Sequence, residues 1–270
     1  MRKIAFYGKG GIGKSTTAAN VSAALASDGY SVCQIGCDPK NDSTRLLLGR
    51  TCTETVLDVV RKYGEKVTIE QVMHPGFANV QCVEAGGPEP GVGCAGRGII
   101  VALETLKELD AMKEEQVTLY DVLGDVVCGG FAVPIREGYA TDIYIVSSGE
   151  LMSLYAANNI AKGIAKFAVR GKVRLGGIIG NSRNIIHEQA LLEAFAAKLN
   201  TSLIAFIPRE GIVHQAEINR KTVIEWAPQS PQADVYRKLA ERIMHNSELT
   251  VPTPMSFEAL EELVLTYGNK

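Results

Sequence analysis

The stretch Gly8-Lys9-Gly10-Gly11-Ile12-Gly13-Lys14-Ser15 decides the fold of this chain of 270 residues. It fits the pattern GxxxxGK[ST], follows an apolar run at 3–7 and precedes a helix-periodic stretch at 14–27. A strand, a glycine-rich loop and a helix in this order are typical of a phosphate-binding loop, where backbone N–H groups and the helix N-terminus surround phosphate oxygens. A chance lysine in a glycine-rich turn would not explain that order.

We therefore predict a nucleotide site in which Lys14 reaches the terminal phosphates and Ser15 supplies an oxygen to Mg²⁺. The expected contacts are Gly8, Lys9, Gly10, Gly11, Ile12, Gly13, Lys14, Ser15 and Thr16.

Short apolar runs alternate with longer helix-periodic stretches along the rest of the chain, which is typical of a parallel sheet covered by helices. The expected strands are 3–7, 31–36, 79–84, 117–122, 142–147, 175–179 and 203–207. The expected helices are 14–27, 53–63, 98–109, 151–167, 188–199, 213–221, 232–245 and 257–267. We predict an α/β fold: a single-domain P-loop NTPase over residues 1–270, with a mostly parallel twisted sheet flanked by helices.

Composition excludes several classes of protein. The chain has 28 basic and 30 acidic residues, so no net charge attracts nucleic acid or anionic lipid. No apolar run is long enough to span a membrane, and the N-terminus lacks the pattern of a signal peptide. We expect a cytoplasmic protein without nucleic-acid or membrane partners, whose 6 cysteines do not form a disulfide framework.

Acidic residues follow two of the expected strands, where open α/β sheets place their ligands. Asp38 and Asp42 follow the second strand, and Asp121 and Asp125 lie at the end of the fourth. One aspartate can anchor the Mg²⁺ shell while another orients water toward the γ-phosphate, although helix capping is an alternative role. Lys9 is similar to the extra lysine of dimeric P-loop ATPases, which crosses to the partner's nucleotide; a solvated loop lysine is the alternative.

Two cysteines, Cys94 and Cys128, lie among glycines, which allow the close backbone approach that an iron–sulfur cluster needs. A [4Fe-4S] cluster takes four thiolates, so two copies of the chain related by a two-fold axis would supply them. Spacing alone leaves packing of these thiols equally open. For the other cysteines, Cys33, Cys37, Cys52 and Cys82, packing is the expected role.

Several long motifs resemble the nitrogenase iron protein family and its nitrogenase-like relatives. They are GKGGIGKST at 8–16, GCDPKNDSTRLLL at 36–48, CVEAGGPEPGVGCAGRG at 82–98, YDVLGDVVCGGFAVPIRE at 120–137, YIVSSGELMSLYAANNI at 144–160 and NSRN at 181–184. The resemblance implies a homodimer with one nucleotide per subunit and a [4Fe-4S] cluster bridging both chains. It also implies electron transfer, driven by MgATP hydrolysis, from ferredoxin or flavodoxin to a catalytic metallocluster protein.

The resemblance assigns roles to individual residues. Cys94 and Cys128 would be the cluster ligands, and Lys9 would cross to the partner's nucleotide. Asp38, Lys40 and Asp42 would form a first switch, and Asp121 and Asp125 a second switch that leads into Cys128. Arg97 would lie at the docking face, as an ion-pairing residue or a site of ADP-ribosylation. The implied adenine contacts are Asn181, Pro208, Arg209, Glu210, Glu217, Gln232 and Tyr236.

The resemblance leaves the final substrate open. Gly180 stands where many nitrogenase iron proteins have cysteine, so the resemblance fits a nitrogenase and also relatives that reduce carbon–sulfur bonds or tetrapyrroles. Two proteins of another class remain as alternatives: a metal-free partitioning ATPase of the same P-loop subclass, and a metal-insertion ATPase.

Overall fold

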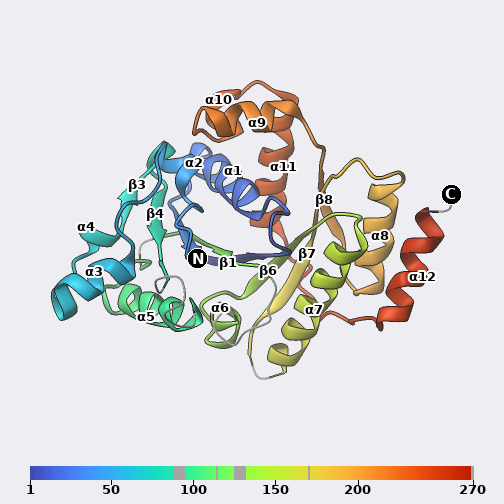
Figure 1. Ribbon diagram of the computed structural model, residues 1–270, viewed down its shortest axis with the longest axis horizontal. Helices are drawn as coiled ribbons and strands as arrows, with labels where there is room; N and C mark the ends of the chain where they lie inside the picture. The colour runs from blue at the N-terminus through green and yellow to red at the C-terminus, as the bar shows by residue number, and fades with distance from the viewer. Residues whose placement is uncertain (88–94, 114, 125–131, 170, 269–270) are drawn as a thin grey trace.

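The computed structural model describes residues 1–87, 95–113, 115–124, 132–169 and 171–268 (Figure 1). Within these residues the strands form one 8-stranded sheet in the order β3-β4-β2-β5-β1-β6-β7-β8. Only β3 runs antiparallel to its neighbour among the described strands. The strands are β1 (Arg2–Tyr7), β2 (Val32–Cys37), β3 (His74–Pro75), β4 (Gln81–Glu84), β5 (Val117–Val122), β6 (Asp142–Ser147), β7 (Arg174–Asn181) and β8 (Leu203–Ile207).

Helices cover both faces of the sheet, as Figure 1 shows with α1 and α11 above it and α5 and α7 below it. The helices are α1 (Lys14–Ser27), α2 (Arg45–Leu48), α3 (Val56–Tyr63), α4 (Ile69–Val72), α5 (Ala95–Glu108), α6 (Val133–Arg136), α7 (Leu151–Ala168), α8 (Glu188–Lys198), α9 (Gly211–Ile218), α10 (Val223–Trp226), α11 (Pro231–His245) and α12 (Phe257–Gly268). Two 3₁₀ turns, η1 (Gly64–Lys66) and η2 (Phe77–Asn79), complete the described elements.

Strand β1 shows how the two hydrophobic cores form. Successive side chains of a strand point to opposite faces of the sheet. Ile4 and Phe6 pack into the core shared with α1 and α11, whereas Ala5 and Tyr7 pack into the core shared with α5, α7 and α8. All four side chains are fully buried. This continuous burial explains why β1 reads as an apolar run rather than as an alternating pattern.

The predicted fold class is confirmed, since the described sheet is mostly parallel and is flanked by helices. The boundaries shift at several ends for local reasons. Helix α3 begins after Thr55 rather than at residue 53, because Thr55 and Asp58 form a capping box. Helix α9 ends at Ile218, ahead of the predicted residue 221, and Arg220 has a left-handed φ of 55°. None of the described helices combines the length and the apolar character needed to cross a membrane.

Candidate functional site

The loop between β1 and α1 has the curled backbone of a phosphate-binding loop. Gly13 is the N-cap residue of α1 and adopts a left-handed φ of 95°. A methyl group at Gly13 would overlap the amide of Asn181, and one at Gly8 would overlap the carbonyl oxygen of Val146. Glycine is therefore required at both positions by close approach as well as by backbone conformation. This packing fixes the loop against the ends of β6 and β7.

Lys14 begins α1 and turns back over the loop. Its side chain is buried, and Nζ donates a hydrogen bond of 3.3 Å to the carbonyl oxygen of Lys9. In the same first turn, Thr16 Oγ1 donates to Glu217 Oε1 at 2.9 Å, which joins α1 to α9. A lysine ammonium held over the N-terminus of a helix adds positive charge where phosphates would lie. Lys9 is half-buried, while the neighbouring Gly10 is exposed.

Asp121 lies beside this loop, in register with Phe6 of β1 on one side and Gly36 of β2 on the other. Burial raises the pKa of its carboxyl, while hydrogen bonds with Ser15 and Ser43 and the charge of Lys14 lower it. The hydroxyl of Ser15 and a buried carboxylate thus meet at one point. Hydroxyl and carboxylate oxygens are the ligands that Mg²⁺ prefers, so this donor set fits a magnesium ion.

The first switch segment follows β2 and reaches the surface. Asp38 is half-buried, and its Oδ1 accepts a hydrogen bond of 2.9 Å from the backbone N–H of Lys40. Lys40 and Asp42 are exposed. The predicted residues of the first switch therefore lie on the same edge of the sheet as Asp121. Asp125 lies outside the described residues, which stop before it at Gly124.

A cavity of about 350 Å³ opens beside the loop. Asn181 Nδ2 donates to the carbonyl oxygen of Ile12 at 2.6 Å, and the Arg183 guanidinium donates to that of Gly11, so β7 holds the loop on this side. Most of the predicted adenine contacts line the cavity: Asn181, Pro208, Arg209, Glu210, Glu217 and Tyr236.

Gln232 is absent from that lining. It is buried and lies against Tyr236, whose pKa burial raises to about 12. Sequence reasoning also missed Arg183 and His214, which do line the cavity. Arg183 lies in the motif NSRN, which is part of the family resemblance, so this motif could have identified Arg183 as a site residue.

The predicted cluster ligands Cys94 and Cys128 lie outside the described residues. The segments that contain them leave the sheet after β4 and β5, which flank β2, and both leave from the edge that carries the phosphate-binding loop. The side chain of Arg97 is not among those described, but the residue lies in the first turn of α5.

The four other cysteines are free and buried. Burial raises the thiol pKa of Cys33, Cys37 and Cys82 well above the ordinary value. A buried neutral thiol is a packing group rather than a metal ligand. Among the residues that the structure describes, no group of three or more His, Cys, Asp or Glu side chains could hold a metal ion.

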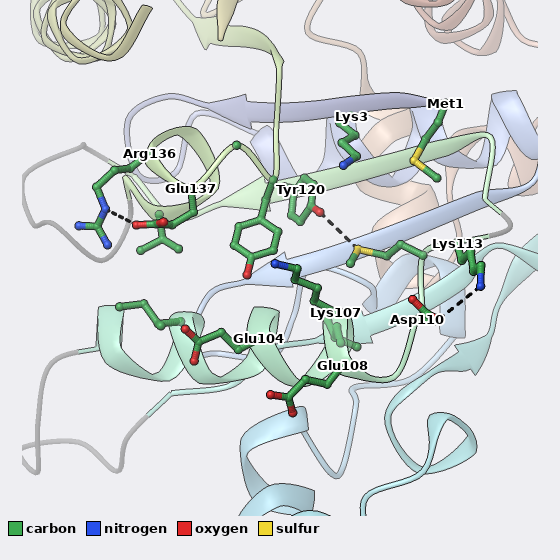
Figure 2. Close-up of a pocket in the computed structure, with 16 residues that line it drawn as sticks. Met1, Lys3, Glu104, Lys107, Glu108, Asp110, Lys113, Tyr120, Arg136 and Glu137 are labelled. Carbon is green, nitrogen blue, oxygen red and sulfur yellow. Dashed lines mark hydrogen bonds and ion pairs between the residues drawn. The ribbon is translucent and has the colours of Figure 1, made fainter. Parts of the chain in front are cut away.

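A larger cavity of about 910 Å³ lies at the opposite end of the strands (Figure 2). Met1, Lys3 and Tyr139 line it, and they flank the N-terminal ends of β1 and β6. Several of its charges are already paired, as Arg136 with Glu137 and Lys113 with Asp110. Ligands of open α/β sheets bind at the carboxyl ends of the strands, so the smaller cavity is the candidate site.

Comparison with known families gives a match over almost the whole chain. The model of the family described as "4Fe-4S iron sulfur cluster binding proteins, NifH/frxC family" matches residues 2–270.

Several solved structures share the fold. The septum site-determining protein MinD of Pyrococcus horikoshii OT3, complexed with Mg-ADP, has a TM-score of 0.72 and 20% identity, covering 91% of this chain and 97% of that one. A ParA family ATPase of Chlorobium tepidum TLS has a TM-score of 0.67 and 18% identity, covering 90% and 98%. Cobyrinic acid a,c-diamide synthase of Mycobacterium smegmatis, with a bound ATP analog and magnesium, has a TM-score of 0.67 and 17% identity, covering 93% and 99%.

Proposed function

The chain belongs to the NifH/frxC family of 4Fe-4S iron–sulfur cluster binding proteins, and from this premise we propose that it is an ATP-driven electron-transfer protein. Two copies hold one [4Fe-4S] cluster, hydrolyse MgATP, and deliver electrons to a partner protein that contains the catalytic metallocluster. One observation carries the proposal: a phosphate-binding loop with Ser15 hydrogen-bonded to the buried Asp121 lies at the edge from which both cysteine segments leave.

The nucleotide binds with its phosphates on residues Gly8–Thr16. The backbone N–H groups of this loop donate hydrogen bonds to the phosphate oxygens, and the N-terminus of α1 stabilises their negative charge. Lys14 releases the carbonyl of Lys9 and contacts the terminal phosphates, while Ser15 and Asp121 hold Mg²⁺ directly or through water. A Mg²⁺ ion held there would supply positive charge next to the phosphates.

Hydrolysis needs groups that orient water, and the two switches supply them. Asp38 and Asp42 of the first switch, with Lys40, lie at the carboxyl edge of the sheet and are proposed to act on the γ-phosphate. Asp125 of the second switch is proposed to orient the attacking water. Lys9 is proposed to reach the nucleotide of the other subunit, so the site is completed only in the dimer.

The nucleotide base occupies the cavity beside Asn181 and Tyr236. Pro208, Arg209 and Glu210 form its wall after β8, and Glu217 reaches it from α9. Gln232 supports this wall through Tyr236 rather than contacting the base. The binding of Mg-ADP by the MinD of similar fold is consistent with this placement.

The cluster ligands are proposed to be Cys94 and Cys128 from each of two copies, four thiolates in all. The cluster supplies a one-electron donor when it is bound. The second switch leads from Asp121 through Gly124 and Asp125 to Cys128, so loss of the γ-phosphate can reshape the surface around this ligand. Gly124 lies against the loop, since a methyl group there would be 4.0 Å from the N atom of Gly10.

The partners follow from this chemistry. A low-potential donor such as ferredoxin or flavodoxin would reduce the cluster, and a nitrogenase or a nitrogenase-like enzyme would accept the electron. Arg97, in the first turn of α5 and three residues from Cys94, is proposed to ion-pair with that acceptor. A site of ADP-ribosylation at Arg97 would block the same contact.

Cysteine substitutions test the ligand assignment. Cys94→Ser and Cys128→Ser should each abolish the iron and the iron-dependent absorbance of protein purified without oxygen. Cys52→Ser is the matched control, because Cys52 is buried and free, and it should retain both. Full retention of iron by the first two variants would refute the assignment.

A second candidate function rests on the fold shared with MinD and the ParA family ATPase. A metal-free ATPase of that type would be colourless and iron-free under argon. A metal-insertion ATPase would lose its iron to an apo-acceptor, whereas an electron donor keeps its iron through repeated reduction and oxidation.

A further inference from the structure

Glu84, the last residue of β4, is a buried carboxyl group for which the nucleotide chemistry above has no use. It is 1% exposed and lies opposite Gly36 of β2. A methyl group at Gly36 would overlap the carboxyl oxygen Oε2 of Glu84, so glycine at this position makes room for the acid. Burying a carboxyl group is costly unless its oxygens are satisfied.

Only one oxygen of Glu84 is satisfied within the described part of the chain. The backbone N–H and the hydroxyl of Thr44 both donate to Oε1, each at 2.7 Å, whereas Oε2 is buried without a hydrogen-bond partner there. Thr44 is the N-cap residue of α2 and is fully buried. An apolar residue at position 84 would avoid the unsatisfied oxygen, so stability alone does not explain this glutamate.

The contacts of Thr44 place Glu84 at the end of the first switch. The switch runs from Asp38 to Asp42 and passes directly into Ser43 and Thr44. Ser43 is held by Gln34, whose Nε2 donates to its carbonyl oxygen at 3.0 Å, and it also hydrogen-bonds with Asp121. Any movement of residues 38–42 would therefore be felt at the two hydrogen bonds from Thr44 to Glu84.

Residues 85–87 lie against the first switch and near the start of α5. Ala85 N–H donates to the carbonyl oxygen of Gly36 at 2.8 Å. A methyl group at Gly87 would lie 2.6 Å from Cβ of Pro39, and one at Gly98 would lie 3.6 Å from Cα of Gly87. Residues 84–87 are thus packed between the switch and the first turns of α5.

From these contacts we propose that Glu84 is a positioning residue that transmits the nucleotide state from the first switch to the N-terminal turns of α5. This connection is separate from the second switch, which runs through β5. It rests on the proposed function only in that a nucleotide must bind at the loop. Its consequence is that the residues directly after Cys94 respond to the first switch.

Hydrogen–deuterium exchange measured by mass spectrometry tests the proposal on protein purified without oxygen, whatever its iron content. Adding MgADP to the wild type should change exchange in α5 by about fivefold or more. Glu84→Ala should remove most of that change in α5. It should leave the response of residues 10–27 in place and the Kd for MgADP within about threefold of the wild type.

Two further variants separate positioning from simple loss of structure. Glu84→Gln keeps an acceptor for Thr44 and should restore the response of α5. Thr44→Val removes one of the two donors and should reduce the response less than Glu84→Ala. Glu261→Gln, on the exposed face of α12, is the matched control and should behave as the wild type.

A response of α5 that persists in both Glu84→Ala and Thr44→Val would overturn the proposal. So would a wild type whose α5 does not respond, or a Glu84→Ala protein that binds no MgADP. A colourless protein that nonetheless shows the expected exchange pattern would refute the proposed electron transfer and leave the role of Glu84 standing.

Discussion

Two buried carboxyl groups, Glu84 and Asp121, lie at the carboxyl ends of the strands on either side of β2, and different neighbours act on the pKa of each. Burial raises the pKa of both. For Asp121, hydrogen bonds with Ser15 and Ser43 and the charge of Lys14 oppose the rise. For Glu84 only the bonds from Thr44 oppose it, and the pKa reaches about 8. Asp121, with Ser15 and Lys14 beside it, is therefore suited to hold a cation, while the raised pKa of Glu84 favours its protonated form at neutral pH.

The raised pKa of Glu84 predicts how stability depends on pH. Its value is about 8 in the folded chain against 4.5 as the ordinary value, so the folded state binds more protons between these limits. The contribution of Glu84 to stability is fully present below 4.5 and is lost as pH rises toward 8. The free energy of unfolding should fall by at most about 1.4 kcal/mol per pH unit on account of this group.

Urea unfolding of wild type and Glu84→Gln in magnesium-free buffer isolates that contribution. Glutamine does not titrate, so the stability of the variant relative to the wild type should increase steadily from pH 5 to about 8. A constant difference across that range would show that Glu84 is already ionised in the folded chain.

At the scale of an element, the N-terminus of α8 organises the loops that follow β6 and β7. Glu188 is buried, and its carboxylate accepts hydrogen bonds from two backbone groups at the ends of these loops: Gly149 N–H at 2.9 Å and Arg183 N–H at 2.9 Å. Ser182 Oγ donates to it at 2.8 Å. The Arg183 guanidinium in turn donates a hydrogen bond to the carbonyl oxygen of Gly11. Glu188 thus stabilises one wall of the nucleotide cavity.

We expect Glu188→Gln to lower the free energy of unfolding by about 2–3 kcal/mol, because charge-assisted bonds become neutral and one acceptor is replaced by a donor. Affinity for MgADP should fall as well, since Arg183 loses its support. Glu193→Gln, on the exposed face of the same helix, serves as the control in urea unfolding. Equal stability of the two variants would mean that the network around Glu188 contributes nothing.

The long elements could be predicted because their signals are local. The apolar run of β1 and the helical periods of α1, α7 and α11 fix their type without reference to the rest of the chain. The short elements could not be predicted in this way. Helix α10 is only four residues long, and β3 is a two-residue strand at His74 and Pro75 that forms by pairing with β4. Such segments take their conformation from tertiary contacts.

The same distinction applies to the site. A continuous sequence motif identifies the phosphate-binding loop, so residues 8–16 could be predicted directly. The acids Glu84 and Glu188 look unremarkable in sequence, since their importance comes from burial and from donors brought together by folding. The prediction of Gln232 as a base contact remains a prediction, and folding brings this residue against Tyr236 rather than into the cavity lining.

At the scale of the whole molecule, the order of the strands places the phosphate-binding loop and the starts of both cysteine-containing segments at the same edge of the sheet. The loop follows β1, and the segments carrying Cys94 and Cys128 follow β4 and β5. In the proposed dimer each copy would supply half of the cluster site, and Lys9 would reach the nucleotide of the other copy. A single chain would then be one half of the working unit.

The substitution Lys9→Ala tests whether two copies of the chain form one working unit. If Lys9 completes the site of the other subunit, the variant should bind MgADP within about threefold of the wild type but hydrolyse ATP at least about tenfold more slowly. Lys238→Ala is the control, because Lys238 is exposed on α11, far from the loop in sequence. Steady-state hydrolysis and equilibrium binding measure the two quantities separately. Equal losses of binding and of hydrolysis would place Lys9 on its own subunit's nucleotide.

We propose that two copies of the chain share one [4Fe-4S] cluster. Native mass spectrometry of protein purified without oxygen, combined with iron analysis, measures it most directly. We predict a brown dimer with four irons, or about two per chain, and a mass that matches one [4Fe-4S] cluster. A colourless, iron-free protein, or a monomer that holds a complete cluster, would contradict this account.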